Sequence, residues 1–169
     1  MGTVVLGIRA DGNLWTDWPD RFEHPWPDAS LCDPTCCDEE AELLIRYFDG
    51  DPVDPATARC HTPHGPAFHH SAWAACRTVP RGSTMTYAEL ADAAGAPNAA
   101  RAAGTAMRSN PLPLFIPCHR IVPSNGGIGG FAGMQDASSS AVRLKDELLD
   151  FEAARADTRT SPVALVASS

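Results

Sequence analysis

The chain has 169 residues, a formal net charge of -8 and 44% hydrophobic residues. This length and composition suit one compact unit or two small domains with a folded core. No apolar run is long enough to span a bilayer, and the first residues lack the pattern of a signal peptide, so we expect a cytoplasmic protein without a membrane partner.

The charge is unevenly distributed along the chain. Residues 1–76 carry 4 Lys or Arg and 13 Asp or Glu, residues 77–120 carry 5 and 2, and residues 121–169 carry 4 and 6. The acidic total argues against a nucleic-acid partner. The one basic segment can nonetheless bind phosphates, with modest and strongly salt-dependent affinity.

Six cysteines in a cytoplasmic protein predict reduced thiols or metal ligands, and not a disulfide framework. Cysteines and histidines that supply enough ligand types for a tetrahedral zinc site are Cys32, Cys36, Cys37, Cys60, His61 and His64. Their spacing lacks a Cys-x-x-Cys pair, and adjacent cysteines rarely bind one ion. We therefore favour reduced thiols, assign no metal ligands and expect no cofactor, with a structural zinc as the alternative.

The N-terminal half predicts a β-hairpin, a helix and a linker. Apolar residues over 4–8 and 14–16 flank a glycine-containing turn, which is typical of a hairpin. Residues 38–48 have apolar side chains at helical spacing after an acidic first turn. Four prolines from Pro52 to Pro66 indicate a linker.

The next segment predicts three helices. The first covers residues 68–78, with Cys76 on its inner face. The second follows Thr86, which forms a capping box with Glu89, and the third runs from Ala99 to about Arg108. The last two, joined by a short turn, resemble a helix-turn-helix.

The third predicted helix consists mainly of small residues, with Arg101 as the exception before Arg108. Such a helix can lie close to a DNA backbone or in a minor groove, where one arginine wedges between bases. Alternatively, the small residues simply allow two helices to pack tightly. The two interpretations are compatible.

Two segments after the helices predict loops. Residues 122–133 are rich in glycine but lack the Lys-Ser/Thr of a phosphate-binding loop, so they suit close backbone approach to a flat ligand. Residues 134–141 predict a mobile surface insertion, and residues 156–169 a disordered tail.

Residues 110–117 consist mainly of apolar residues and prolines. The next residue is Cys118, which is followed directly by two potential cations, His119 and Arg120. A neighbouring imidazole or guanidinium favours the nucleophilic thiolate, so we predict that Cys118 is reactive. The alternative is a buried structural cysteine, but the two polar neighbours would then need partners of their own.

On an extended strand Cys118 and His119 would point to opposite faces, so we expect a water to connect them, with His119 as the base. A carboxylate is then needed behind the imidazole. Glu152 is our choice from the acidic helix over 144–152, although spacing alone does not separate it from Glu147 or Asp150.

At this point the sequence resembles a known family, the O6-alkylguanine-DNA alkyltransferases or methylated-DNA-protein-cysteine methyltransferases. The resemblance spans about residues 65–152, and its signature is Pro-Cys-His-Arg at 117–120. The segments that carry it, in the family's order and spacing, are 86–90, 98–107, 109–122, 129–133 and 148–152.

The resemblance implies an α+β fold of two domains. The first is a small ribonuclease-H-like sheet-and-helix domain in residues 1–64, which resembles the family only in layout. The second is a winged helix-turn-helix-like alkyltransferase domain in residues 65–155. A monomer that acts on double-stranded DNA containing O6-alkylguanine is implied.

The implied activity is single-turnover repair, in which the thiolate takes a methyl or larger alkyl group permanently from O6 of guanine, with O4 of thymine as a second candidate. Cys118 matches the acceptor, His119 the water-linked base, Glu152 the acid behind it and Asn110 the brace of the active-site turn. The remaining matched or neighbouring residues are assigned to DNA or substrate binding: Tyr87, which helps rotate the nucleotide out, Arg101, which fills the vacated stack, and Arg108, Arg120, Ile121, Gly130, Phe131 and Ala132.

The sequence departs from the family's pattern around the implied guanine pocket. Phe131 stands where tyrosine is frequent, Met134 replaces a glycine, and the chain between Gly133 and Lys145 is several residues longer than usual. A longer, Ser-rich flap would admit bulkier alkyl groups, or would be a disordered loop.

Three other functions compete with repair. Lesion-binding relatives lack the acceptor cysteine, so the presence of Cys118 argues against a lesion-binding role. A Cys-His hydrolase would turn over repeatedly, and it leaves the helix-turn-helix unexplained. A DNA-binding regulator with a zinc module would bind metal and would not need Cys118.

Overall fold

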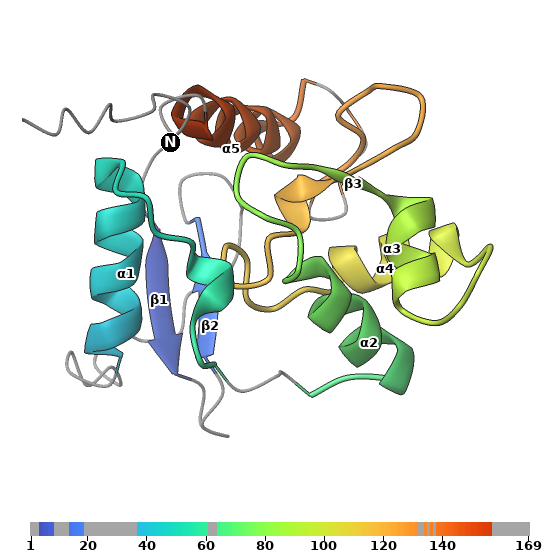
Figure 1. Ribbon diagram of the computed structural model, residues 1–169, viewed down its shortest axis with the longest axis horizontal. Helices are drawn as coiled ribbons and strands as arrows, with labels where there is room; N and C mark the ends of the chain where they lie inside the picture. The colour runs from blue at the N-terminus through green and yellow to red at the C-terminus, as the bar shows by residue number, and fades with distance from the viewer. Residues whose placement is uncertain are drawn as a thin grey trace, which may run out of the picture.

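Two groups of short elements lie side by side in the computed structural model (Figure 1). The model describes residues 4–8, 14–18, 37–60, 64–131, 134, 136 and 138–156. The first group, on the left of Figure 1, holds the strands β1 (Val5–Ile8) and β2 (Leu14–Asp17) and the helix α1 (Asp38–Asp49). The second holds the helices α2 (Ala67–Cys76), α3 (Tyr87–Ala93) and α4 (Ala100–Arg108), and the helix α5 (Ser140–Ala156) lies across the top.

The predicted hairpin and first helix are confirmed. β1 pairs antiparallel with β2, with Val5 opposite Asp17 and Ile8 opposite Leu14. Helix α1 ends at Gly50, whose φ of 97° is the left-handed conformation that glycine adopts without strain.

The predicted helix-turn-helix is also confirmed. The Thr86 hydroxyl accepts a hydrogen bond from the Glu89 amide at 3.2 Å, and the Glu89 carboxylate accepts one from the Thr86 amide at 2.7 Å, which completes the capping box. The turn to α4 contains Asn98 in the left-handed region, at a φ of 66°. The Trp73 indole of α2 donates to the Ala106 carbonyl of α4 at 2.9 Å, so the three helices pack as one unit.

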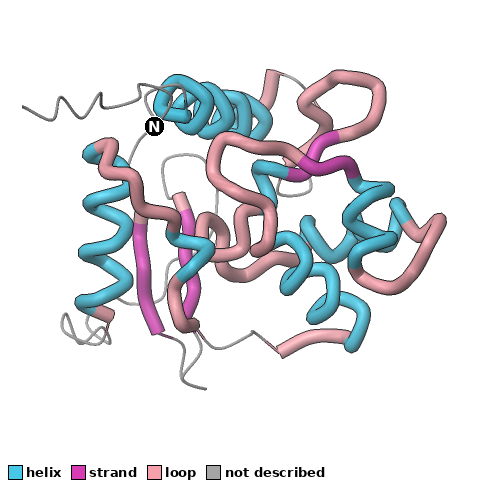
Figure 2. The backbone as a smooth tube through the Cα atoms, in the orientation of Figure 1, coloured by secondary structure: helices cyan, strands magenta, loops and turns pink. Residues whose placement is uncertain are grey.

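A short parallel pairing brings the start of α3 next to Cys118, the cysteine that we predict to be reactive. β3 (Met85–Thr86) pairs with β4 (Ile121–Val122), and β4 directly follows η3, a single 3₁₀ turn over Cys118–Arg120. Figure 2 shows these two strands between the helices and the long loops. Residues more than thirty positions apart in the chain therefore meet at one place.

The prediction of a mobile surface insertion over 134–141 is wrong for the last two residues of that range. Helix α5 already begins at Ser140, and Ala141 is buried in the core. Ala141, Leu144 and Leu148 recur at helical spacing and form one buried face, so burial extends the helix beyond the residues that the acidic pattern indicated. Of the predicted disordered tail over 156–169, Ala156 is instead the last residue of α5, and residues 157–169 lie outside the described residues.

The predicted linker is packed structure where it is described. It contains η2 (Pro55–Thr57), with Pro55 and Ala56 buried, and the Asp54 side chain caps it by accepting from the Ala56 amide at 3.1 Å. The Arg77 guanidinium donates to the Ala56 carbonyl at 3.0 Å. The Arg77 contact crosses the predicted domain boundary at 64/65, so the two halves share an interface. The boundary itself stays a prediction.

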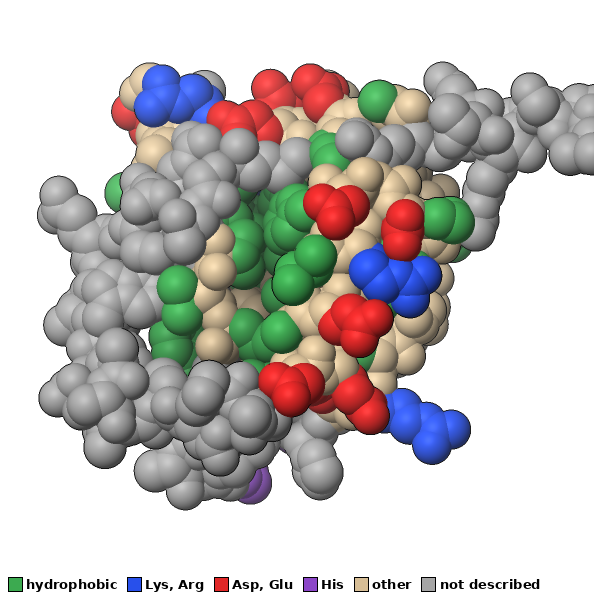
Figure 3. Space-filling model, turned by 90° about the vertical axis from the view of Figure 1, so that its left-hand side faces the viewer, with side chains coloured by type: hydrophobic (Ala, Val, Ile, Leu, Met, Phe, Trp, Pro, Cys, Tyr) green, Lys and Arg blue, Asp and Glu red, His purple; other side chains and the backbone are tan. Residues whose placement is uncertain are grey.

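Among the described residues of the N-terminal half, most of the acidic side chains belong to α1. Figure 3 shows this side of the molecule, where Asp and Glu side chains outnumber Lys and Arg around an apolar area. Helices α3 and α4 lie at the opposite end of the molecule (Figure 1). The acidic face is therefore remote from the predicted DNA-binding helices. Within the described part of the chain, every helix is too short or too polar to cross a membrane.

Candidate active site

A single asparagine holds the loop that carries the reactive cysteine. The Asn110 side-chain nitrogen donates to Cys118 Sγ at 3.1 Å and to the Ile116 carbonyl at 2.8 Å, while its oxygen accepts from the Leu112 amide at 3.0 Å. These three bonds tie both ends of the loop to one side chain. The geometry agrees with the bracing role that the resemblance implies for Asn110.

The thiol is presented from a tight turn, so the expectation of an extended strand at Cys118 and His119 is wrong. The Cys118 amide donates to the Ile116 carbonyl at 2.7 Å around Pro117, whose φ of -78° and ψ of 63° define an inverse γ-turn. Cys118, His119 and Arg120 then form η3. Leu114, at a φ of 73°, is a strained residue in the same loop.

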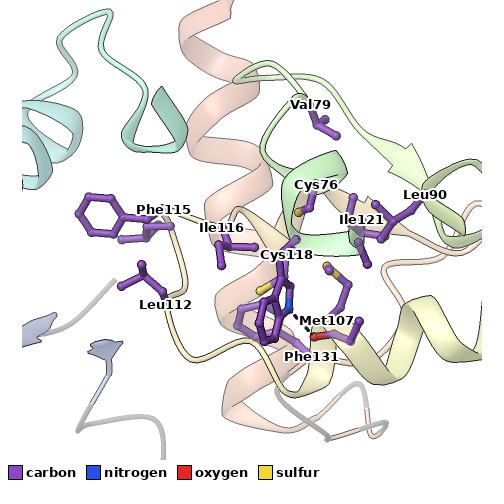
Figure 4. Close-up of a cluster of buried hydrophobic side chains, with 14 of the residues drawn as sticks. Cys76, Val79, Leu90, Met107, Leu112, Phe115, Ile116, Cys118, Ile121 and Phe131 are labelled. Atoms are coloured by element: carbon purple, nitrogen blue, oxygen red, sulfur yellow. Dashed lines mark hydrogen bonds between the residues drawn. The ribbon is translucent and has the colours of Figure 1, made fainter. Parts of the chain in front are cut away.

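Cys118 lies in an apolar environment and is only 6% exposed. Figure 4 shows its side chain among Ile116, Met107, Phe131 and Ile121. Burial raises the pKa of the Cys118 thiol, against the opposing effects of the Asn110 hydrogen bond and the Lys145 charge. The raised pKa favours the neutral thiol, and the two side chains that we expected to favour the thiolate, His119 and Arg120, both bond to Glu152 instead.

His119 is bonded to Glu152, the carboxylate that we chose among three. Nε2 of His119 and Oε1 of Glu152 are 3.1 Å apart, and both side chains are 1% exposed. Burial alone would raise the pKa of Glu152, but hydrogen bonds from His119 and Arg120 hold it well below its usual range. Since an ionised carboxylate only accepts, Nε2 must carry the proton.

The second nitrogen of His119 is left without a proton at neutral pH. Burial lowers the pKa of His119, although the hydrogen bond and charge of Glu152 oppose this shift. The neutral ring with its proton on Nε2 has its lone pair on Nδ1. His119 is thus poised to accept one proton there, and the resulting imidazolium would face the Glu152 carboxylate.

Arg120, which the sequence assigned to DNA or substrate binding, has its side chain occupied by partners within the protein. Its side chain is completely buried and donates to Glu152 from Nε at 3.0 Å and from Nη2 at 2.8 Å. It also donates to both carboxylate oxygens of Asp54, at 2.9 and 3.0 Å, and to the Val79 carbonyl at 2.8 Å. A guanidinium with these partners is a structural centre between the two halves of the chain.

Lys145 is a site residue that the sequence reasoning missed. Its ammonium is buried, donates to the Ile121 carbonyl at 2.6 Å and lies 5.7 Å from the centre of the Tyr87 ring. Burial lowers the pKa of Lys145 to about 8. The available signal was its position four residues after Ala141, on the apolar face of α5.

Replacing Lys145 by methionine is expected to raise the pKa of Cys118 further, because the Lys145 charge favours the thiolate. We expect a several-fold smaller thiolate fraction at neutral pH, where Lys145, with a pKa of about 8, is still largely charged. The pH dependence of Cys118 alkylation by iodoacetamide, followed by peptide mass spectrometry, measures it. Arg143→Met removes an exposed cation from the same helix and should leave the pH midpoint unchanged; an unchanged midpoint in Lys145→Met contradicts the prediction.

The residues assigned to DNA binding lie along α3 and α4. Tyr87 opens α3 and is half-buried beside Gly104 of α4, and burial raises its pKa to about 12, so the phenol stays protonated. Arg101 in the first turn of α4 and Arg108 at its end are both exposed. These positions agree with the assigned roles but do not test them.

The residues assigned to the pocket wall lie close to Lys145. Ile121 is buried, and its carbonyl is held by the lysine; Gly130 is half-buried, with its carbonyl 3.5 Å from the same ammonium. Phe131 is buried and pairs through its backbone with Met134, whose side chain is exposed. Ala132 lies outside the described residues, so its assignment stays a prediction.

The zinc alternative also stays untested. Cys32, Cys36 and His61 lie outside the described residues. Within the part that the structure describes, no group of three or more His, Cys, Asp or Glu side chains is arranged for a metal ion. Cys60 and Cys76 are free thiols, and the Arg77 guanidinium donates to Cys60 Sγ at 3.3 Å.

Comparison with known proteins yields consistent relatives. The family model described as 6-O-methylguanine DNA methyltransferase, DNA binding domain, matches residues 67–154. The constitutive methylated-DNA-protein-cysteine methyltransferase of Bacillus subtilis is 31% identical over 138 residues, which are 82% of this chain and 76% of that protein. The methylated-DNA-protein-cysteine methyltransferase of Mycobacterium tuberculosis is 39% identical over 124 residues, covering 73% and 70% of the two chains.

Solved structures agree with the sequence matches. The Mycobacterium tuberculosis OGT crystallised in complex with DNA superposes with a TM-score of 0.69 at 27% identity, over 92% of this chain and 91% of that one. A crystal structure of the Mycobacterium tuberculosis O6-methylguanine methyltransferase gives a TM-score of 0.68 at 26% identity, over 96% and 98%. These matches confirm the predicted α+β fold class, and together with the Asn110-Cys118-His119-Glu152 geometry they establish that the chain belongs to the 6-O-methylguanine DNA methyltransferase family.

Proposed function

We propose that this protein repairs double-stranded DNA by transferring an alkyl group from O6 of guanine to Cys118, once per molecule and irreversibly. The observation that carries the proposal is the chain of contacts from Asn110 to the Cys118 sulfur and from His119 to Glu152, inside the segment that matches the family model. Mycobacterium tuberculosis OGT, which has a similar fold, has been crystallised with DNA.

The proposed reaction is one displacement at carbon. The Cys118 proton passes to His119 Nδ1, through a water or directly, and the sulfur attacks the alkyl carbon. The bond from that carbon to O6 breaks, its electron pair stays on guanine, and guanine takes up a proton at N1 from solvent, to which the imidazolium of His119 returns the thiol proton. The product thioether has no leaving group comparable with guanine, so the protein is consumed.

The buried thiol requires that the guanine leave the base stack. Cys118 is 6% exposed, and a base within a duplex cannot align its O6 substituent with such a sulfur. We assign displacement of the nucleotide to Tyr87, at the start of α3, and filling of the gap to Arg101, in the first turn of α4. With a net charge of -8, DNA binding should be modest and salt-dependent. The proposal places the reaction in the cytoplasm, where the thiol is kept reduced.

The test is the intact mass of the protein before and after incubation with a duplex that contains O6-methylguanine. We expect a gain of one methylene equivalent that stops at one per protein and is absent in Cys118→Ala. Cys60→Ala is the matched control, because Cys60 is a more exposed thiol outside the site, and it should retain the gain. Repeated turnover would indicate a hydrolase, and tight lesion binding without any mass gain would indicate a recognition protein; either result overturns the proposal.

A further inference from the structure

The Glu152 carboxylate accepts five hydrogen bonds. Its Oε1 accepts from the Tyr47 hydroxyl at 2.6 Å, from Arg120 Nη2 at 2.8 Å and from His119 Nε2 at 3.1 Å. Its Oε2 accepts from Arg120 Nε at 3.0 Å and from the Gly82 amide at 3.1 Å. The Tyr47 bond is the shortest of the five, and it comes from the N-terminal half, outside the segment that matches the family model.

The tyrosine ring is held in one place by its surroundings. Tyr47 is completely buried, and its ring lies 5.0 Å from that of Phe48 and 5.3 Å from that of Phe151. The Arg81 guanidinium lies 4.6 Å from the ring centre, over Tyr47. Burial raises the pKa of Tyr47 far above its usual value, so the hydroxyl is a permanent donor. The direction of the Tyr47 hydroxyl is therefore set by the packing of the ring and not by the position of Glu152.

Tyr47 and His119 donate to the same oxygen. Each donor withdraws charge from Oε1, so a strong bond from Tyr47 weakens the attraction of Glu152 for a proton on His119. Arg120 acts in the same direction through its charge, and Lys145 adds to it, whereas Glu152 itself favours the imidazolium. Besides Glu152, the charged groups that act on His119 or Tyr47 from the packed elements are Arg120 on η3, Lys145 on α5 and Arg81 before β3.

We propose that Tyr47 is a positioning residue for the reaction: its hydroxyl orients the Glu152 carboxylate and limits the pull of that carboxylate on the His119 proton. The consequence is that His119 remains neutral and able to accept the thiol proton. The inference rests on the proposed function of Cys118 and assigns to the N-terminal half a part in setting the protonation of His119.

The test replaces Tyr47 by phenylalanine, which keeps the ring and removes one donor. With less competition for Oε1, the pKa of His119 should rise by about half a unit to one unit, the equivalent of one neutral hydrogen bond. The acid limb of the pH profile of single-turnover alkyl transfer should move to higher pH by the same amount. The ¹⁵N shifts of the His119 ring report its protonation directly.

The matched control is Thr16→Val. The Thr16 hydroxyl is buried and donates to the Pro113 carbonyl at 2.7 Å, so this variant also removes one hydroxyl bond between the two halves but does not touch Glu152. It should lose stability without any shift in the pH profile. If Tyr47→Phe behaves like Thr16→Val, with unchanged His119 shifts and pH profile, Tyr47 is a structural contact only and the proposal is overturned.

A second measurement covers the case in which Tyr47→Phe does not fold. The chain has two tyrosines, Tyr47 and Tyr87, so the whole protein can be labelled with 3-fluorotyrosine. The fluorinated phenol is a stronger donor, and the His119 ring should shift further toward the neutral form; no change, or a change toward the imidazolium, overturns the proposal. If the parent protein transfers no alkyl group, the proposed function fails, but the His119 shifts still decide the role of Tyr47.

Discussion

Replacement of Glu152 by glutamine should slow alkyl transfer by about 100- to 10,000-fold, the range typical for loss of a positioned acid-base system. Two carboxylate oxygens now accept five hydrogen bonds, and the amide would offer one oxygen for the same donors. The imidazolium that forms when His119 takes the thiol proton would also lose its countercharge. Single-turnover transfer from a duplex containing O6-methylguanine, quenched at intervals and followed by intact mass, measures the rate.

Asp150→Asn provides the matched control for Glu152→Gln. Asp150 lies two residues earlier on the same helix, was one of the alternatives considered for the same role, and is exposed. Its amide variant should transfer the alkyl group at the parent rate. A folded Glu152→Gln variant with a rate within threefold of the parent would show that proton transfer at His119 does not need the carboxylate.

Replacement of Arg120 by methionine should lower the free energy of unfolding by about 3–5 kcal/mol, the cost of leaving one side of a buried ion pair without its partner. The guanidinium joins Glu152 of the C-terminal half to Asp54 of the N-terminal half, and all three residues are at least largely buried. Methionine fills much of the volume but leaves Glu152 with a buried charge. Urea denaturation at pH 7 measures the loss.

The loss in Arg120→Met should shrink in acid. In the parent, the lowered pKa of Glu152 contributes stability that is fully present above its ordinary value of 4.5 and is lost as the pH falls. In the variant the same carboxyl lacks its cation, its pKa rises, and protonation relieves the buried charge, so the two stabilities converge below about pH 4.5. Arg46→Met is the control, since the exposed Arg46-Asp51 pair should contribute at most about 1 kcal/mol. Equal losses in the two variants would contradict the central role of Arg120.

The local elements were predictable because their signals are local. The Thr86-Glu89 capping box needs only residues three apart, and it forms as expected. The hairpin of β1 and β2 follows from two apolar runs around a turn. Helix α5 was predicted too short because Ser140 and Ala141 are helical through burial against the core, which a run of serines does not reveal.

The electrostatics of the site could not be predicted from adjacency in the chain. His119 and Arg120 follow Cys118 directly, and this suggested two cations that activate the thiol, but both turn to Glu152. The cation that does favour the thiolate is Lys145, from a helix that begins more than twenty residues later. Sequence neighbours diverge here because η3 is a tight turn and not an extended strand.

The sequence by itself determined the helix-turn-helix and the family, and it singled out Cys118 and His119 as the candidate site, since these depend on residue types at short, ordered spacings. Only the tertiary structure decided which groups control the chemistry. The groups around the site come from segments up to 105 positions apart: Tyr47, Asp54, Arg120 and Glu152. They meet because the packed elements leave one buried place for a carboxylate and its donors. The physical reason is that burial makes each hydrogen bond and each charge depend on every neighbour, and those neighbours are set by packing.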